Sequence, residues 1–201
     1  MTPALVAFLA LLAAERIAEM SLSSRHAEIL IRRGAVEFGA RHFPLIVALH
    51  LLFPLALVAE VLWAGARPPG SWPWWLGLLL AAQVLRFATL HVLGEYWNVR
   101  IRVVPGMTPV RRGPYRFLRH PNYVAVVIEL ASAPMMFGAW RTALVFSAFN
   151  AAVLVIRIRE EERALAWATI QREAAITTAD SGATSAGTGS STRSTSNVMS
   201  S

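Results

Sequence analysis

Cysteine is absent from this chain of 201 residues, and so is lysine. Without cysteine there is no disulfide framework, thiolate metal site, cysteine nucleophile or thioether lipid anchor. Charged residues are also scarce, at 15% of the sequence, whereas soluble domains carry about 25%. Hydrophobic residues make up 55% of the sequence, and the mean hydropathy is +0.48. Because the apolar residues form long runs, the sequence predicts an all-α integral membrane protein.

Arginine supplies all 19 basic residues, and the formal net charge is +7. Such a surplus can indicate nucleic-acid binding. Here, however, the arginines lie beside apolar segments, where membrane topology and lipid headgroup contact account for them. We therefore predict membrane lipid, and no nucleic acid, as the partner of these arginines. The folded part also has no His-rich spacing typical of a metal site, so no metal is predicted.

Five apolar segments have roughly the length of about 20 residues that a membrane-spanning helix needs. They are Pro3–Met20, Phe43–Trp63, Trp72–Leu93, Pro121–Gly138 and Trp140–Ile156. The first lacks the basic leader of a signal peptide and is predicted to be a retained helix. The connection between the last two segments is too short to form a loop of its own, so the sequence predicts a tight C-terminal helical hairpin.

Two further predictions concern the C-terminal part. Residues 160–173 read as a short cytosolic helix, which completes a helical transmembrane domain over residues 1–173. Residues 174–201 are rich in Ser, Thr and Gly and have almost nothing to bury. They are predicted to form a disordered tail.

Arginines concentrate in three places: between the first and second segments, between the third and fourth, and after the fifth. The other two connections hold one each, Arg67 and Arg141. Because positive charge stays on the cytoplasmic side, we expect an external N-terminus, with residues 94–120 and 157–201 inside. The composition is typical of a GC-rich bacterial genome, so the inner membrane is the expected location.

The stretch RRGPYRFLRHPNY, residues 111–123, places fixed charge directly before an apolar segment. Pro121 suits the first turn of a helix, so His120 and Pro121 are expected at a helix N-terminus. Free N–H groups and the positive helix end favour an anion there. Arg119 adds charge, while Tyr115 and Tyr123 add rings and hydroxyls. This combination predicts a binding site for a soluble anionic cofactor with a base to stack.

Acidic residues 160–162 follow the fifth segment, and the predicted hairpin returns them to the face that holds Arg119 and His120. Together with these basic groups, Glu161 and Glu162 could bind a cofactor that carries a zwitterionic amino acid part and ribose hydroxyls. Mutual salt bridging is an alternative that is compatible with such a site.

Ionisable residues within the spans are candidates for function because they are costly in lipid. Arg86 is expected to pair with a carboxylate as a structural element. His91, near the cytoplasmic end of the third segment, is a candidate for the reaction centre. A cleft lined by His50, Arg86 and His91 is expected to admit a long-chain substrate from the bilayer.

These motifs resemble a known family. The C-terminal part is similar to the isoprenylcysteine carboxyl methyltransferase family of membrane enzymes. The similarity lies in the stretch GPYRFLRHPNYVAVV, the predicted hairpin that follows it, and the stretch REEERAL. The N-terminal half resembles the bacterial branch of that family through the stretch ERIAEMSLSSRHAEILIRRGAVEFGARHFPLIVALH. Together the matches cover about residues 5–165. The resemblance implies that S-adenosyl-L-methionine binds at the cytosolic face, through the C-terminal hairpin. It also implies that a lipophilic acceptor enters from the bilayer.

The resemblance extends to individual positions. Arg119, His120, Pro121 and Tyr123 match the family's Arg-His-Pro-x-Tyr motif, and residues 161–162 match its Glu-Glu pair. Two features depart from the pattern. A Ser/Thr-rich tail stands where eukaryotic members have a segment that closes the pocket, and Ala125 stands where the wider family often has Gly.

The implied activity is O-methylation of a phenolic or polyketide lipid, or of a prenylcysteine-like carboxylate. A phenol needs a base, for which His91 and His120 are candidates. One alternative is an NADPH-dependent membrane reductase of the sterol reductase type, which shares an Arg/His-Pro-Asn-Tyr stretch. Residues 124–125 are Val-Ala, however, where those proteins have Gly-Glu. A non-catalytic membrane scaffold is the second alternative.

Overall fold

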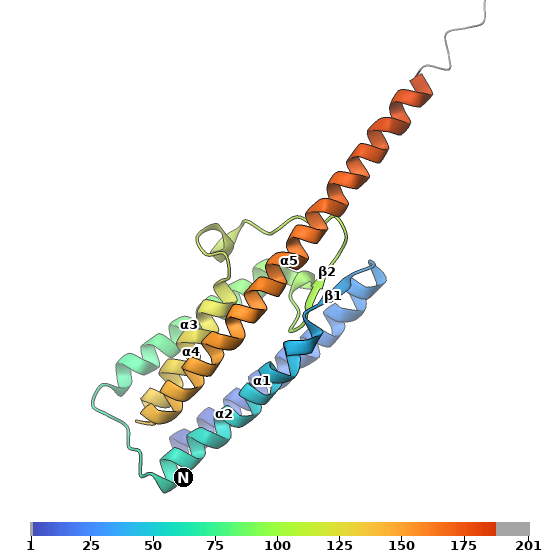
Figure 1. Cartoon of the computed structure of the whole chain (residues 1–201). Helices are drawn as coiled ribbons and strands as arrows, with labels where there is room; N and C mark the ends of the chain where they lie inside the picture. The colour runs from blue at the N-terminus through green and yellow to red at the C-terminus, as the bar shows by residue number, and fades with distance from the viewer. Residues whose placement is uncertain (1, 188–201) are drawn as a thin grey trace, which may run out of the picture.

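The computed structural model describes residues 2–187, with side chains as far as residue 178. In this part of the chain five α-helices run side by side along one bundle (Figure 1). They are α1 (Pro3–Arg32), α2 (Phe43–Trp63), α3 (Trp72–Leu93), α4 (Pro121–Met136) and α5 (Trp140–Gly187). Three short 3-10 helices lie in the connections: η1 (Ala40–His42), η2 (Gly94–Tyr96) and η3 (Gly113–Arg116). The predicted all-α class is confirmed.

Three of these helices are long and apolar enough to cross a membrane. They occupy Ala40–Trp63, Trp72–Tyr96 and Trp140–Thr178. Helices α2 and α3 have the predicted bounds, and each has a proline in its first turn, where proline costs no hydrogen bond. Helices α1 and α4 pack against α2 and α3 through shared apolar clusters around Leu49 and Leu57. The chain is therefore a membrane protein, and the crossing of the bilayer by all five helices stays a prediction.

The C-terminal hairpin is confirmed: only residues 137–139 separate α4 from α5. Gly138 turns the chain with a φ of +77°, and a Cβ there would collide with the carbonyl oxygen of Arg67, so glycine is required. Glu60 of α2 accepts hydrogen bonds from the backbone N–H groups of Arg141 (3.1 Å) and Thr142 (2.7 Å). This buried carboxylate thereby caps the start of α5, where helices favour negative charge.

A two-stranded ribbon joins connections that are distant in the sequence. Strand β1 (Val36–Phe38) pairs antiparallel with β2 (Ile101–Val103), with Val36 opposite Val103. Its apolar side packs on Ala164 and Ala168 of α5. The ribbon lies at the end of the bundle where α1 leads into α2 and α3 leads into α4 (Figure 1). We call this the ribbon end.

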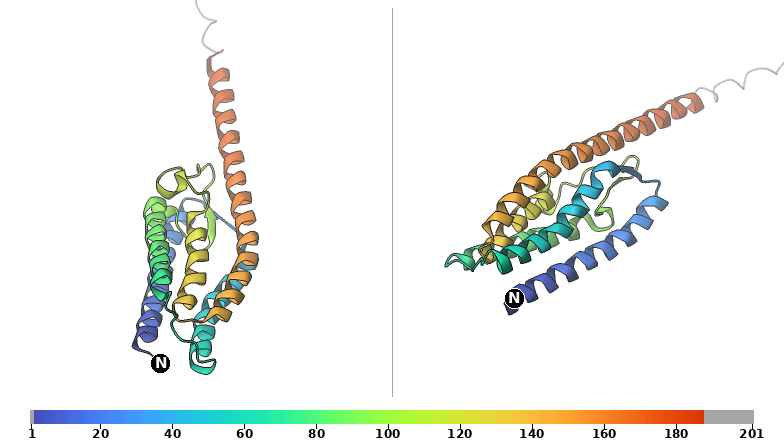
Figure 2. Two further views of the ribbon diagram at one scale, coloured as in Figure 1. Left: turned by 90° about the vertical axis from the view of Figure 1, so that its left-hand side faces the viewer. Right: turned by 60° about the horizontal axis from the view of Figure 1, so that its bottom comes forward.

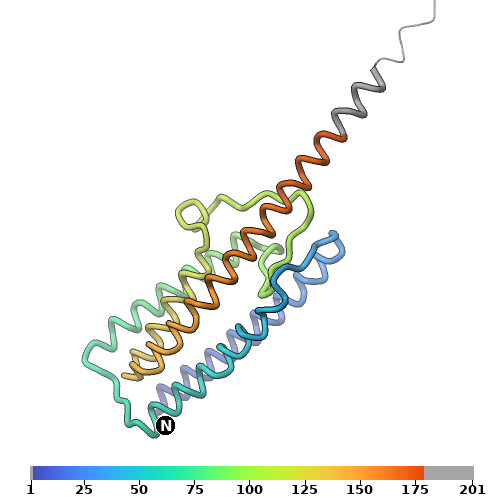
Figure 3. The backbone as a smooth tube through the Cα atoms, in the orientation of Figure 1, coloured from blue at the N-terminus to red at the C-terminus, as the bar shows by residue number. Residues whose placement is uncertain are grey.

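The three arginine-rich segments all lie at the ribbon end, because the helices alternate in direction along the bundle (Figure 3). Arg67, in the connection between α2 and α3, and Arg141, in the first turn of α5, lie at the opposite end. This arrangement is the one that the arginine distribution predicts. The orientation of the bundle relative to the cytoplasm stays a prediction.

Helix α5 continues far beyond the bundle and is described as far as Gly187 (Figure 2). The interpretation of residues 160–173 as a short helix of their own is therefore wrong, because they continue α5. The helix also runs through residues 174–187, and the division of the chain into a domain and a tail stays a prediction. Extending an existing helix adds one hydrogen bond per residue without a new nucleus. The hydroxyls of Thr177 and Thr178 also donate to the carbonyls one turn before them. The remainder of the predicted tail, residues 188–201, lies outside the described residues.

A cluster of charged side chains is buried within the bundle. The guanidinium of Arg86 on α3 lies 2.8 Å from Glu19 and 3.6 Å from Glu15 of α1, and also bonds Glu129 of α4. Arg16 lies 3.0 Å from Glu19. The predicted pairing of Arg86 with a carboxylate is confirmed, and the cluster connects three helices.

Candidate functional site

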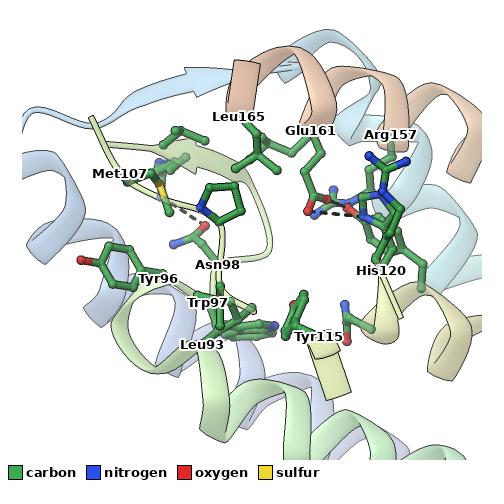
Figure 4. A pocket seen from close by; sticks show the side chains of 18 of the residues that line it. Leu93, Tyr96, Trp97, Asn98, Met107, Tyr115, His120, Arg157, Glu161 and Leu165 are labelled. Carbon is green, nitrogen blue, oxygen red and sulfur yellow. Dashed lines mark hydrogen bonds and ion pairs between the residues drawn. The ribbon is translucent and has the colours of Figure 1, made fainter. Parts of the chain in front are cut away.

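A cavity opens at the ribbon end of the bundle, and we call it the outer cavity. Figure 4 shows Glu161 and Leu165 projecting from α5, with Trp97 and Tyr115 facing them across the cavity. The wall also includes β2 and the first turn of α4.

Most of the predicted cofactor residues meet in this cavity. Its lining includes Tyr115, Arg119, His120, Tyr123 and Glu161. They come from η3, from the loop that follows it, from the start of α4 and from α5. The hairpin brings them together because α5 returns alongside α4.

Two further predicted residues lie at the margin of the outer cavity. Glu162 is half-exposed and lines an adjoining open groove, 3.8 Å from both Arg119 and His120. Pro121 is buried in the first turn of α4. It fixes the backbone where the helix begins and does not line the cavity.

The Glu161 carboxylate is held by a chain of hydrogen bonds. It accepts one from the hydroxyl of Tyr123. Arg157 Nε donates to the same hydroxyl over 3.0 Å, and its NH2 group donates to the Val99 carbonyl over 2.6 Å. The His120 ring stacks on Tyr123 with 5.4 Å between ring centroids. The arrangement fixes a carboxylate, a guanidinium and two rings around one corner of the cavity.

Electrostatics favour the cationic form of His120. The Glu161 carboxylate, 3.6 Å from Nδ1, has the largest effect and raises the pKa of His120. Burial acts in the opposite direction, and the charge of Glu162 adds to the increase. Burial also raises the pKa of Tyr115, so that hydroxyl stays protonated and able to donate at neutral pH.

Some polar atoms around the outer cavity have no hydrogen bond within the described residues. Asn122 Oδ1 is buried and has none, and His120 Nδ1 is buried with the Glu161 carboxylate 3.6 Å away, beyond hydrogen-bond distance. Buried polar atoms in folded proteins are nearly always hydrogen-bonded. Both residues line the cavity, so a ligand with donors and acceptors would satisfy them.

A second cavity lies between the helices, and we call it the inner cavity. Five residues form a wall shared with the outer cavity: Trp97, Asn98, Asn122, Tyr123 and Arg157. The rest of its lining combines apolar and polar side chains from the five α-helices with Val99 of the connection between η2 and β2. These residues are Arg16, Glu19, Ile46, Leu49, His50, Arg86, Val99, Val126, Asn150, Val153 and Leu154. The two cavities therefore meet at Tyr123 and Arg157.

The structure does not bring His91 to either cavity. Its side chain is exposed on α3, and it lines neither the outer nor the inner cavity. His50 and Arg86, which were expected beside it in a cleft between the spans, do line the inner cavity. The predicted cleft thus contains two of its three named residues.

Of the five residues in the shared wall, only Tyr123 was predicted from the sequence as a site residue. Asn98 is fixed from a distant helix, because its side-chain amide donates to the Ser23 carbonyl over 2.9 Å. No local pattern reveals such a contact. Arg157 had a usable signal: it precedes Glu161 by four residues, and residues four apart share one helix face. From the sequence alone, Arg157 was interpreted only as one of the arginines that set the membrane topology.

Comparisons with known proteins agree with this geometry. Residues 75–167 match the model of the isoprenylcysteine carboxyl methyltransferase family. Every residue that lines the outer cavity falls within this range. No solved structure matches the chain.

Two bacterial relatives extend the similarity over most of the chain. The chain is 42% identical over 160 residues to the "Uncharacterized protein YpbQ" of Bacillus subtilis, which covers 78% of this chain and 94% of that protein. It is 30% identical over 151 residues to an "Uncharacterized protein" of Haemophilus influenzae, with 75% and 88% covered.

Proposed function

Because the chain belongs to the isoprenylcysteine carboxyl methyltransferase family of membrane methyltransferases, we propose that it uses S-adenosyl-L-methionine to methylate an oxygen atom of a lipophilic acceptor. The observation that carries this proposal is the wall shared by the two cavities. A cavity at the ribbon end that combines charged side chains with rings suits a soluble methyl donor. A cavity between apolar helices suits the acceptor, and the shared wall is where the two would meet.

The residues of the outer cavity fit the methyl donor. S-Adenosyl-L-methionine carries a sulfonium, an aromatic base, ribose hydroxyls and a zwitterionic amino acid part. Tyr115 offers a ring for the base, and Glu161 offers a carboxylate for cationic or hydroxyl groups. Arg119 offers charge for the donor's carboxylate. The buried polar atoms of His120 and Asn122 offer further hydrogen bonds.

S-Adenosyl-L-methionine supplies an already activated methyl group, so the protein mainly aligns the reactants and excludes water. Arg157 and Tyr123 hold Glu161 in one orientation. The stacked rings of His120 and Tyr123 cover the corner of the cavity beside them. These contacts fix the shared wall before a ligand arrives, which lowers the cost of alignment.

The acceptor is a lipid that partitions into the membrane. The inner cavity has apolar walls from residues such as Leu49 and Leu154, and polar groups such as His50 and Asn150. That mixture suits a long chain with a polar head. A phenolic or polyketide lipid hydroxyl and a prenylcysteine-like carboxylate both meet this description. With the ribbon end in the cytoplasm of a bacterial inner membrane, the donor would enter from the cytosol.

Binding to the purified protein tests the proposal. In calorimetry with detergent-solubilised full-length protein, S-adenosylhomocysteine should bind at one site and NADPH should not. Binding of NADPH without S-adenosylhomocysteine would reject the methyltransferase and favour the reductase. Binding of neither would favour a scaffold.

A further inference from the structure

The protonation of one inner-cavity histidine is set by its backbone contact. His50 of α2 lines the inner cavity, and its Nδ1 lies 2.7 Å from the carbonyl oxygen of Ile46. A carbonyl oxygen only accepts, so Nδ1 must carry the proton. In the neutral ring the lone pair is then on Nε2. In the described part of the chain Nε2 forms no hydrogen bond.

The charged neighbours of His50 are already engaged. Arg16 and Glu19 of α1 pair with each other over 3.0 Å, and Arg86 of α3 pairs with Glu19 over 2.8 Å. The charged and titratable groups that α5 and α4 present to the cavity, Arg157 and Tyr123, bond each other. Among the described residues that line the inner cavity, His50 is the one titratable base outside these pairs.

The two histidines expected from the sequence are less suited to accept a proton. His91 is exposed on α3 and lines neither cavity. His120 lies beside Glu161 and Glu162, which favour the imidazolium, a form with no free lone pair. His50 has a free ring nitrogen, and its cavity adjoins the proposed donor site.

We propose that His50 is the proton acceptor for a weakly acidic hydroxyl, a phenol or an enol, bound in the inner cavity. This inference rests on the proposed function. The hydroxyl oxygen forms a bond to the methyl carbon as the carbon–sulfur bond breaks, and sulfur keeps the bonding pair. The hydroxyl proton passes to Nε2 of His50. The products are the methyl ether, neutral S-adenosylhomocysteine and an imidazolium that then releases its proton to solvent.

The proposal predicts which acceptors depend on His50. A phenol has a pKa of about 10 and is mostly protonated at neutral pH, so it needs a base. A carboxylate has a pKa near 4 and is already ionised. A carboxylate acceptor in the same cavity would therefore not use His50.

The test compares two probes in one variant. His50→Gln keeps an amide that can donate to Ile46 but has no basic nitrogen. The full chain, reconstituted in vesicles with labelled S-adenosyl-L-methionine, is given para-dodecylphenol or dodecanoic acid. At neutral pH the rate on the phenol should fall about 100-fold or more, the usual effect of losing a general base. The rate on the acid should change less than about threefold, because no proton is transferred.

Two further measurements do not depend on a single rate. The wild-type rate on the phenol should rise with pH and level off as His50 becomes neutral, whereas the variant should lack this plateau. In nitrogen NMR of histidine-labelled protein without ligand, the ring signal lost in His50→Gln should report a neutral ring protonated at Nδ1. S-Adenosylhomocysteine affinity should be unchanged in the variant, which shows that the fold is intact.

Several results would overturn the proposal. They are equal losses on both probes, a loss in His91→Gln in place of His50→Gln, a ring protonated at Nε2, and no methylation of the phenol by wild-type protein that binds S-adenosylhomocysteine. Failure of the proposed function is distinct, since the wild-type protein would then not bind S-adenosylhomocysteine at all.

Discussion

Three consecutive glutamates after the apolar part of α5 have three different surroundings. Glu160 pairs with Arg163 over 2.6 Å. Glu161 points into the outer cavity and bonds the Tyr123 hydroxyl (Figure 4). Glu162 is half-exposed near Arg119. Successive helix residues are rotated by about 100°. For this reason one turn of α5 directs the carboxylate of Glu161 into the outer cavity and the other two carboxylates away from it.

This difference predicts contrasting effects of one substitution at adjacent positions. Glu161→Gln should weaken S-adenosylhomocysteine binding by about 1–3 kcal/mol, the usual cost of losing a hydrogen bond to a charged group. Glu160→Gln should leave binding unchanged, because its carboxylate lines neither cavity. Calorimetry on both variants checks the pair. Equal losses, or native affinity in Glu161→Gln, would contradict the site.

His120 should make the stability of the ligand-free protein depend on pH. Glu161 raises the pKa of His120 above its ordinary value of 6.5, so the folded state binds this proton more tightly than the unfolded state. The resulting stabilisation is complete at pH values below the unfolded pKa and is lost as pH rises through the folded pKa. Wild type should therefore exceed His120→Gln in thermal midpoint at acidic pH, with the gap narrowing as pH rises. A gap that widens would contradict this sign.

At the scale of the helices, the cluster of Glu15, Arg16, Glu19, Arg86 and Glu129 connects α1, α3 and α4. These groups lie in an apolar bundle, where an unpaired charge is expensive. Arg86 is the most buried of the five, with 4% of its side chain exposed. Arg86 lies beside three carboxylates at once. The free-energy cost of burying these charged carboxylates therefore depends on Arg86.

Removal of this guanidinium should destabilise the bundle. Arg86→Met leaves three carboxylates with Arg16 as the remaining cation of the cluster, and breaking a buried ion pair in this way costs about 3–5 kcal/mol of unfolding free energy. Arg32→Ala is the matched control, because the Arg32–Glu28 pair is exposed and such pairs contribute little. Thermal unfolding in detergent checks both. A small effect of Arg86→Met, with the bundle intact, would mean that the carboxylates are protonated or hydrated.

The sequence predicted the helices best where apolar length and proline agree. Phe43–Trp63 and Trp72–Leu93 were correct to the residue because proline marks their first turns. The ribbon was missed because three-residue strands carry almost no alternating pattern. The extension of α5 was missed because the composition of residues 174–187 was weighed without the helix that precedes them.

At the scale of the whole molecule, all arginine-rich segments gather at the ribbon end (Figure 1). We expect this end in the cytoplasm. The chain has no cysteine, so single cysteines report without interference. Those placed at exposed Ser71 and Thr108, at opposite ends of the bundle, should react with an impermeant reagent from opposite sides, Ser71 from outside. Reaction of both from the same side would contradict the topology.

The predicted residues of the outer cavity could be identified from the sequence, because they come from one hairpin and the loop before it. Arg119, His120 and Tyr123 are adjacent in sequence, and the hairpin alone returns Glu161 to them. The inner cavity was less predictable, since its lining depends on how α1, α2 and α5 face one another. Sequence periodicity indicates that a helix has a polar face, but not which neighbour that face meets. This is why His91 was grouped with His50 and Arg86.

Transfer of a labelled methyl group tests the central claim most directly. Vesicles that contain the full chain are incubated with labelled S-adenosyl-L-methionine and host lipid extract, and organic and aqueous products are separated. We predict that label moves into the organic phase with wild-type protein and with Glu160→Gln, and that transfer is strongly reduced with Glu161→Gln. Label found only in water-soluble products or in protein, or equal transfer by both variants, would contradict the account.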